Sequence, residues 1–281
     1  MRQYVSVVMP DKKGKIRISG KDCRYMQQVL RLKRGDSLDV RLPDGQLILM
    51  QAVNFTKNYV ELCKVISDKK IPCSKNLTTS IEKGVSASAL EANISNSGIE
   101  HQCEYWLFQF MVRPQKMDQI IRQSVECGIS HIVPIKGDFS PVFSSDRITR
   151  WDRIVKEAMQ QSGSAIATKI LKPQTLKQAI DLWNQDFEEK NQLSNKRRCA
   201  FLLDENPATK SSLFSMLSEK PDKVVFAVGC EGGMSKEEVD MLTSVGFNKI
   251  HFNTNILRAE TAAMYGIAVL QYAVTEYESW K

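Results

Sequence analysis

The sequence predicts an α/β protein in which a small β-rich domain precedes a larger domain built on a mostly parallel sheet. Strand and helix patterns alternate along residues 104–281, which is typical of a parallel sheet covered by helices. Two apolar runs in this region, Cys199–Leu203 and Val224–Val228, are continuous, as expected for strands that are buried on both faces. Residues 1–66 instead contain short strand patterns and one helical segment.

The first domain, residues 1–66, is expected to form a compact barrel-like sheet with one helix. The expected strands are Gln3–Met9, a segment containing Ile16 and Ile18, Leu38–Leu42, Gln46–Val53 and Tyr59–Ile66. Apolar residues at helical spacing predict a helix over Lys21–Leu32. Pro43-Asp44-Gly45 predicts a tight turn, because Pro fixes φ and Gly accepts a positive φ.

Residues 67–103 are rich in Ser, Asn and Lys and show little periodic apolar content. They predict a polar linker or a mobile insertion between the two domains. The alternative is a partly ordered extension of the first domain.

The second domain, residues 104–281, is expected to hold five strands and at least four helices. The expected strands are Tyr105–Met111, Ile129–Ile135, Cys199–Leu203, Val224–Val228 and Lys249–Phe252. Apolar faces predict helices that end near Gly128 and Gly163, and a long final helix with Ala263, Ile267 and Leu270. Ser235 and Glu238 have capping-box spacing and predict the start of a further helix.

The composition limits the classes of function. The formal charge is +7, which favours a polyanionic partner, although it could simply keep the chain soluble. Basic residues concentrate between Lys12 and Arg34, where they are candidates for phosphate contacts. The seven cysteines include no Cys-x-x-Cys pair, and the three histidines are scattered. We therefore expect reduced thiols, no metal site, no membrane segment and a cytoplasmic protein.

Three turns in the last third of the chain each follow a predicted strand. They are Leu203-Asp204-Glu205-Asn206-Pro207, Gly229-Cys230-Glu231-Gly232-Gly233 and Phe252-Asn253-Thr254-Asn255-Ile256-Leu257-Arg258. Ligands of open parallel sheets bind beyond the carboxyl ends of the strands, so one pocket could use all three turns. The glycines would let a ligand approach the backbone, although a glycine-rich turn can also serve plain chain reversal. Neither the phosphate-loop pattern nor the Gly-x-Gly-x-x-Gly fingerprint is present, which argues against a nucleotide-dependent oxidoreductase.

Arg258 and Glu260 lie at the start of the predicted final helix. An arginine there could hold a phosphate or stabilise a developing oxyanion. The alternative is a helix-end salt bridge between Arg258 and Glu260. These residues alone do not decide between the two.

The order of two C-terminal motifs resembles the bacterial RsmE family. The motifs are Gly229-x-Glu231-Gly232-Gly233, followed by Ser235 and Glu238, and Ile256-Leu257-Arg258-x-Glu260-Thr261-Ala262. Further matches are Val29-Leu30-Arg31-Leu32 with Gly35-Asp36, Lys116-Met117 with Glu126-x-Gly128, and Gln161-Ser162-Gly163. Members of this family methylate N3 of a uridine in 16S ribosomal RNA. The resemblance implies a SPOUT-type catalytic domain with a C-terminal trefoil knot, preceded by a PUA-like RNA-binding domain.

The resemblance also implies the cofactor, the partners and the site residues. S-adenosylmethionine would be held by the knot loops, which map here to Leu203, Gly229, Gly232, Gly233, Phe252, Ile256 and Leu257. Arg258 would stabilise the anionic base, Glu260 would orient Arg258, and Glu231 would contact the base or the sulfonium. The partner would be 16S ribosomal RNA or the small ribosomal subunit, not DNA. The enzyme would be a homodimer that pairs through its long final helix.

Some positions depart from the family pattern. The family usually has arginine where this chain has Phe139, Ser164 and Asn255. These departures leave one alternative open, a non-catalytic RNA-binding protein that retains the methyltransferase fold. Binding of S-adenosylmethionine would distinguish the enzyme from the pure RNA binder.

Overall fold

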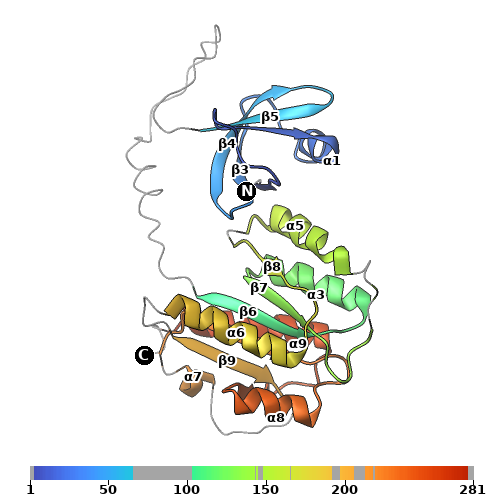
Figure 1. Ribbon diagram of the computed structural model, residues 1–281, viewed down its shortest axis with the longest axis vertical. Helices are drawn as coiled ribbons and strands as arrows, with labels where there is room; N and C mark the ends of the chain where they lie inside the picture. The colour runs from blue at the N-terminus through green and yellow to red at the C-terminus, as the bar shows by residue number, and fades with distance from the viewer. Residues whose placement is uncertain are drawn as a thin grey trace. The chain divides into compact units, whose positions relative to one another are not determined.

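The structure is a computed structural model that describes residues 3–65, 103–142, 144, 148–164, 166–191, 197–205, 213–217 and 219–277. The predicted linker at residues 67–103 lies outside the described residues, apart from Cys103. The chain divides into two compact units (Figure 1). The first unit comprises Met1–Val8, Leu38–Leu47 and Cys103–Lys281, and the second comprises Met9–Ser37 and Ile48–Gln102.

The second unit contains an antiparallel meander. Strand β5 (Tyr59–Lys64) pairs with both β2 (Lys15–Ser19) and β4 (Leu47–Phe55). Alternate residues of these strands are buried, among them Ile16 and Ile18, because successive side chains of a strand point to opposite faces. The strand predictions for this part of the chain are therefore confirmed.

The helix predicted over Lys21–Leu32 is shorter and less regular than expected. A short α-helix, α1 (Gly20–Arg24), continues directly into a π-helical turn, η1 (Tyr25–Val29). Met26 is fully buried, and the Gln27 side chain donates a hydrogen bond of 2.8 Å to the carbonyl of Thr56. Apolar spacing does not distinguish a π-turn from an α-turn, because the two differ by only one residue per hydrogen-bonded ring.

The predicted turn at Pro43-Asp44-Gly45 follows strand β3 (Ser37–Arg41). Strand β1 (Gln3–Val5) pairs in parallel with β3. Gly45 has a φ of 87° and donates a backbone hydrogen bond to Leu42, as the turn requires. Arg41 is buried and donates to the carbonyls of Gly45 and Ser164, and burial lowers its pKa. Ser164 therefore contributes its backbone carbonyl to this buried arginine.

The first unit is built on a parallel sheet, as predicted. Its strands are β6 (Glu104–Phe110), β7 (His131–Ile135), β8 (Lys169–Ile170), β9 (Arg198–Leu203), β10 (Lys223–Val228) and β11 (Asn248–Ile250). They follow one another across the sheet in the order β11-β9-β10-β6-β7-β8, and every pair is parallel. All six residues of β10 are buried, because the strand is central and covered on both faces.

Helices cover both faces of this sheet (Figure 1). They are α3 (Pro114–Glu126), α5 (Trp151–Ser162), α6 (Leu176–Asn191), α7 (Leu213–Met216), α8 (Lys236–Ser244) and α9 (Ala259–Thr275). Trp106 of β6 packs edge-on against Trp183 of α6. Phe226 of β10 lies beside Gly266 of α9 and is in register with Leu107, the residue after Trp106. Neighbouring residues of a strand face opposite ways, so α6 and α9 cover opposite faces.

The helix ends that local sequence patterns predicted are present in the structure. Ser235 and Glu238 form a full capping box at the start of α8. Helix α5 ends at Gly163, which adopts the left-handed conformation with a φ of 66°. The sequence prediction lacked β8, α6 and α7. Within the part of the chain that the structure describes, no helix is long and apolar enough to cross a membrane.

Candidate functional site

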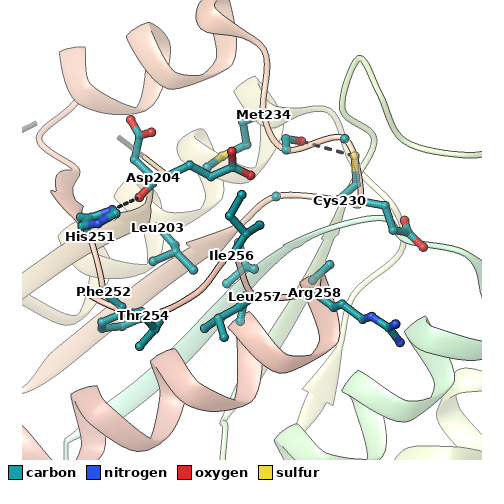
Figure 2. A pocket seen from close by; sticks show the side chains of 18 of the residues that line it. Leu203, Asp204, Cys230, Met234, His251, Phe252, Thr254, Ile256, Leu257 and Arg258 are labelled. Atoms are coloured by element: carbon teal, nitrogen blue, oxygen red, sulfur yellow. Dashed lines mark hydrogen bonds between the residues drawn. The ribbon is translucent and has the colours of Figure 1, made fainter. Parts of the chain in front are cut away.

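A cavity of about 690 Å³ opens at the carboxyl ends of β9, β10 and β11 (Figure 2). Its size is within the range of roughly 300–1,000 Å³ that is usual for small-molecule sites. The three turns singled out in the sequence all contribute to its wall. The lining includes Leu203, Gly229, Glu231, Gly232, Gly233, Phe252, Ile256, Leu257 and Arg258. Glu260 lies just beyond the lining, on the first turn of α9.

The first turn is fixed to the neighbouring strand end. The backbone N–H of Asp204 donates to the carbonyl of Ile250, at 3.0 Å. Its carboxylate lies 3.0 Å from the ammonium group of Lys249, and Nδ1 of His251 lies 3.2 Å from its carbonyl (Figure 2). These contacts hold the ends of β9 and β11 together, so Leu203 is presented on a fixed edge of the cavity.

The second turn depends on its glycines. The N–H of Gly233 donates to the carbonyl of Cys230 at 3.0 Å, and Gly233 has a φ of 77°, which favours glycine. A Cβ atom on Gly229 would lie 2.8 Å from the carbonyl carbon of Gly233. The Cys230 thiol contacts the carbonyl of Gly233 at 3.3 Å, and burial raises the pKa of this thiol. The turn is thus folded tightly on itself and offers backbone groups to the cavity.

The third turn presents apolar side chains. Ile256 is 85% exposed although it lines the cavity, so its side chain is available to an apolar part of a ligand. Phe252 packs edge-on against Tyr265 of α9, with ring centroids 4.9 Å apart. Figure 2 shows Ile256, Leu257 and Arg258 in succession on the segment that leads into α9. The cavity therefore combines apolar surface with charged groups.

A small network of charges borders the cavity. Glu231 Oε1 accepts hydrogen bonds from the backbone N–H of Arg113 at 3.3 Å and from its Nε at 3.0 Å. The ammonium group of Lys116 lies 3.7 Å from Glu231 and 2.9 Å from Glu260. Lys116 therefore joins the glycine turn to the start of α9. This link connects two segments that are separated in the sequence.

The structure gives Glu260 an ion-pair partner that the sequence did not predict. Glu260 is paired with Lys116, and no ion pair or hydrogen bond joins it to Arg258 in the described residues. Arg258 is the N-cap residue of α9, and Glu260 is the second residue of that helix. Side chains two positions apart on a helix do not face each other. Within the described chain, no carboxylate forms an ion pair with the exposed guanidinium group of Arg258.

Both acidic side chains of the network remain ionised at neutral pH. Burial alone would raise the pKa of Glu231, but the hydrogen bonds from Arg113 and the charge of Lys116 outweigh it and lower the pKa. Burial opposes ionisation of Glu260 too, and Lys116 and the charge of Arg258 again make the net shift of its pKa downward. At this edge of the cavity the carboxylates of Glu231 and Glu260 therefore lie among the cations of Arg113, Lys116 and Arg258.

The sequence analysis assigned no role to Arg113 or Lys116. Both follow the buried strand β6, so the rule that ligands bind beyond strand ends could have identified them. Lys116 had been noted only as part of a family motif. Among the described residues, no group of His, Cys, Asp and Glu side chains could hold a metal ion.

Gly229→Ala is expected to weaken ligand binding at this cavity. The new Cβ atom would lie 2.8 Å from the backbone of Gly233, so the turn must open. For S-adenosylmethionine, the cofactor that the RsmE resemblance implies, we expect the affinity measured by calorimetry to fall by about tenfold or more, or about 1.4 kcal/mol. Gly232→Ala is the matched control, because its Cβ atom would face Phe139 at 3.1 Å and not the turn itself. An equal loss in both variants, or none in Gly229→Ala, would contradict this account of the turn.

Comparisons with known proteins identify a family that matches most of the first unit. The model of the RNA methyltransferase domain family matches residues 100–271. The "Ribosomal RNA small subunit methyltransferase E 2" of Borreliella burgdorferi is 28% identical over 261 residues, covering 90% of this chain and 89% of that protein. A "Ribosomal RNA small subunit methyltransferase E" of Aquifex aeolicus is 34% identical over 159 residues, which cover 55% of this chain and 62% of that protein.

A solved structure shows the same fold. The Neisseria gonorrhoeae ribosomal RNA small subunit methyltransferase E, crystallised with bound S-adenosylmethionine, superposes with a TM-score of 0.69 at 20% identity. The superposition covers 97% of each chain. Because the family model matches more than half of the sequence, this chain belongs to the RNA methyltransferase domain family.

Proposed function

We propose that the protein transfers a methyl group from S-adenosylmethionine to N3 of a uridine in 16S ribosomal RNA. The observation that carries the proposal is the cavity at the strand ends, which has the exposed guanidinium group of Arg258 at its mouth and, among the described residues, no carboxylate in an ion pair with it. The RNA methyltransferase family and the relatives named for small-subunit ribosomal RNA support the same substrate class.

The cavity fits S-adenosylmethionine in size and chemistry. Leu203, Phe252, Ile256 and Leu257 would contact its apolar and aromatic parts, and the backbone of Gly229, Gly232 and Gly233 would approach it closely. Acidic groups at the cavity suit a ligand that carries a sulfonium and an ammonium group. When bound, this cofactor supplies an electrophilic methyl group on its sulfonium.

The chain's own residues would act on the uridine. N3 carries a proton at neutral pH, and loss of that proton to water leaves a negative charge on N3 and the two carbonyl oxygens. Arg258 would donate to this anion, because a cation beside a partly enclosed site stabilises developing negative charge. Glu231 would contact the base or hold the positively charged end of the cofactor. Glu260 would act through Lys116, which it contacts, and so position the glycine turn relative to α9.

The domain arrangement is part of the proposal. Residues 1–66 would form a PUA-like RNA-binding domain, and residues 104–281 a SPOUT domain with a trefoil knot. Exposed basic residues of the second unit support RNA binding, namely Lys12, Lys13, Lys21, Arg24, Arg31, Lys33 and Arg34. We further propose a cytoplasmic homodimer that pairs through α9, because Tyr265 and Tyr272 of that helix are 42% and 60% exposed.

The test is methyl transfer from labelled S-adenosylmethionine to purified small-subunit RNA and to intact small subunits. Mass spectrometry of nuclease digests should show one N3-methyluridine that is absent without the protein. Cofactor binding without transfer to either substrate would contradict the proposed reaction. If RNA binds but the cofactor does not, the chain is a non-catalytic RNA-binding protein, and the proposal fails.

A further inference from the structure

The loop that follows β7 is held rigidly beside the cavity. The N–H of Asp138 donates to Glu238 Oε1 at 2.8 Å, and the Ser235 hydroxyl donates to the carboxylate of Asp138 at 2.6 Å. Both partners belong to the capping box of α8. A Cβ atom on Gly137 would lie 2.4 Å from the ring of Phe110, so this end of the loop is also closely packed. The loop therefore has little freedom to rearrange.

An aromatic ring projects from this fixed loop. Phe139 is 56% exposed, although the residue before it is anchored on both its N–H and its carboxylate. A Cβ atom on Gly232, which lines the cavity, would lie 3.1 Å from Cβ and 3.5 Å from Cγ of Phe139. The side chain of Phe139 thus lies beside the cavity wall that Gly232 forms, and more than half of the residue's surface is exposed.

We propose that Phe139 is a specificity-determining residue whose ring stacks against a base next to the target nucleotide. The inference rests on the proposed function, because it assumes that a base enters the cavity. A base that leaves its stack to enter a pocket deprives its neighbour of a stacking partner. A ring beside the pocket supplies a replacement surface, and because the loop backbone is anchored at Asp138, little backbone entropy is lost on binding.

A base is the ligand that this position fits best. Proteins recognise single-stranded RNA largely by stacking bases on aromatic side chains, in combination with cations that contact the phosphates. Arg113, Lys116 and Arg258 supply the cations around the cavity. Phe139 has no charge or polar group to offer a phosphate, so its contribution should depend on the base and not on the salt concentration.

The experiment compares two probes that differ only in their bases. One is a single-stranded oligouridylate, and the other is an abasic ribose-phosphate strand of equal length. Fluorescence anisotropy at several salt concentrations gives the dissociation constants of the full-length protein and of Phe139→Ala, Phe139→Leu and Phe139→Trp. Leu keeps apolar bulk without a ring, and Trp keeps a ring.

The wild-type protein should prefer the oligouridylate to the abasic strand. In Phe139→Ala and Phe139→Leu this preference should fall by about tenfold, equal to about 1.4 kcal/mol, within the range found for base stacking on aromatic side chains. Phe139→Trp should keep the preference, and the salt dependence should be the same in all four proteins. An unchanged preference in Phe139→Ala, or no preference in the wild type, would overturn the proposal.

Two further measurements distinguish base stacking by Phe139 from a role of its ring in cofactor binding or in assembly. Calorimetry with S-adenosylmethionine should give the same affinity for all four proteins, and sedimentation should give the same assembly state. If Phe139→Ala weakens cofactor binding or changes assembly while its preference between strands is intact, the ring serves the cofactor or a subunit contact and the proposal is wrong. Absence of methyl transfer by the wild type would refute the proposed function alone, because the strand comparison needs no turnover.

Discussion

Arg258→Ala is expected to lower kcat/KM for methyl transfer by about 100-fold or more. Removing one preorganised donor from a site of developing negative charge typically costs about 2.7–4 kcal/mol in the barrier. The variant should fold normally, because Arg258 is exposed and its side chain makes no capping hydrogen bond to α9. The measurement is the initial rate on small-subunit RNA under limiting substrate.

Controls for this variant separate charge from geometry. Arg258→Lys keeps a positive charge but loses the planar fork, so its activity should lie between those of Arg258→Ala and the wild type. Arg113→Ala removes another cation of the cavity, one already engaged with Glu231, and we expect a loss below about tenfold, or 1.4 kcal/mol. Activity of Arg258→Ala within about threefold of wild type, about 0.7 kcal/mol, would rule out its proposed role.

Gly266→Ala is expected to destabilise the fold by about 1–3 kcal/mol. A Cβ atom there would lie 2.0 Å from Cε1 and 2.2 Å from Cζ of Phe226. Alanine favours a helix over glycine by only about 1 kcal/mol, and overpacking at a buried contact outweighs that gain. Urea unfolding of the variant should give a lower midpoint with an unchanged slope.

A second substitution tests the cause of this destabilisation. Phe226→Leu removes the ring atoms that the new methyl group would meet. The double variant should therefore be more stable than the sum of the two single changes predicts. If the two single changes in unfolding free energy simply add up in the double variant, or if Gly266→Ala is as stable as the wild type, then α9 shifts away from β10 without cost.

Features encoded within a few residues were predictable from the sequence. The capping box at Ser235 and Glu238 and the turn at Gly45 depend on local backbone chemistry. The parallel sheet followed from continuous apolar runs. Helix α6 was missed, although Leu176, Ala179, Ile180 and Trp183 recur at helical spacing. The apolar spacing that predicts this helix was therefore present in the sequence.

The pairings within the charge network could not be predicted, because its members are far apart in the chain. Lys116 lies on α3, Glu231 in the glycine turn and Glu260 on α9. Only the sheet order brings these segments together, and neither periodicity nor motif spacing gives that order. Sequence reasoning therefore located the three turns of the cavity but did not predict the ion pair between Lys116 and Glu260.

The sheet order also determines when the cavity can form during synthesis. The central strands β6 and β10 are direct neighbours in the sheet, yet Gln109 and Val228 at their ends are 119 residues apart in the chain. Contacts between distant residues slow folding, because a long loop must close before any pairing energy is gained. A ribosome must therefore release most of this polypeptide before the middle of the sheet can assemble, and a shortened nascent chain would leave the edge of β6 that pairs with β10 uncovered.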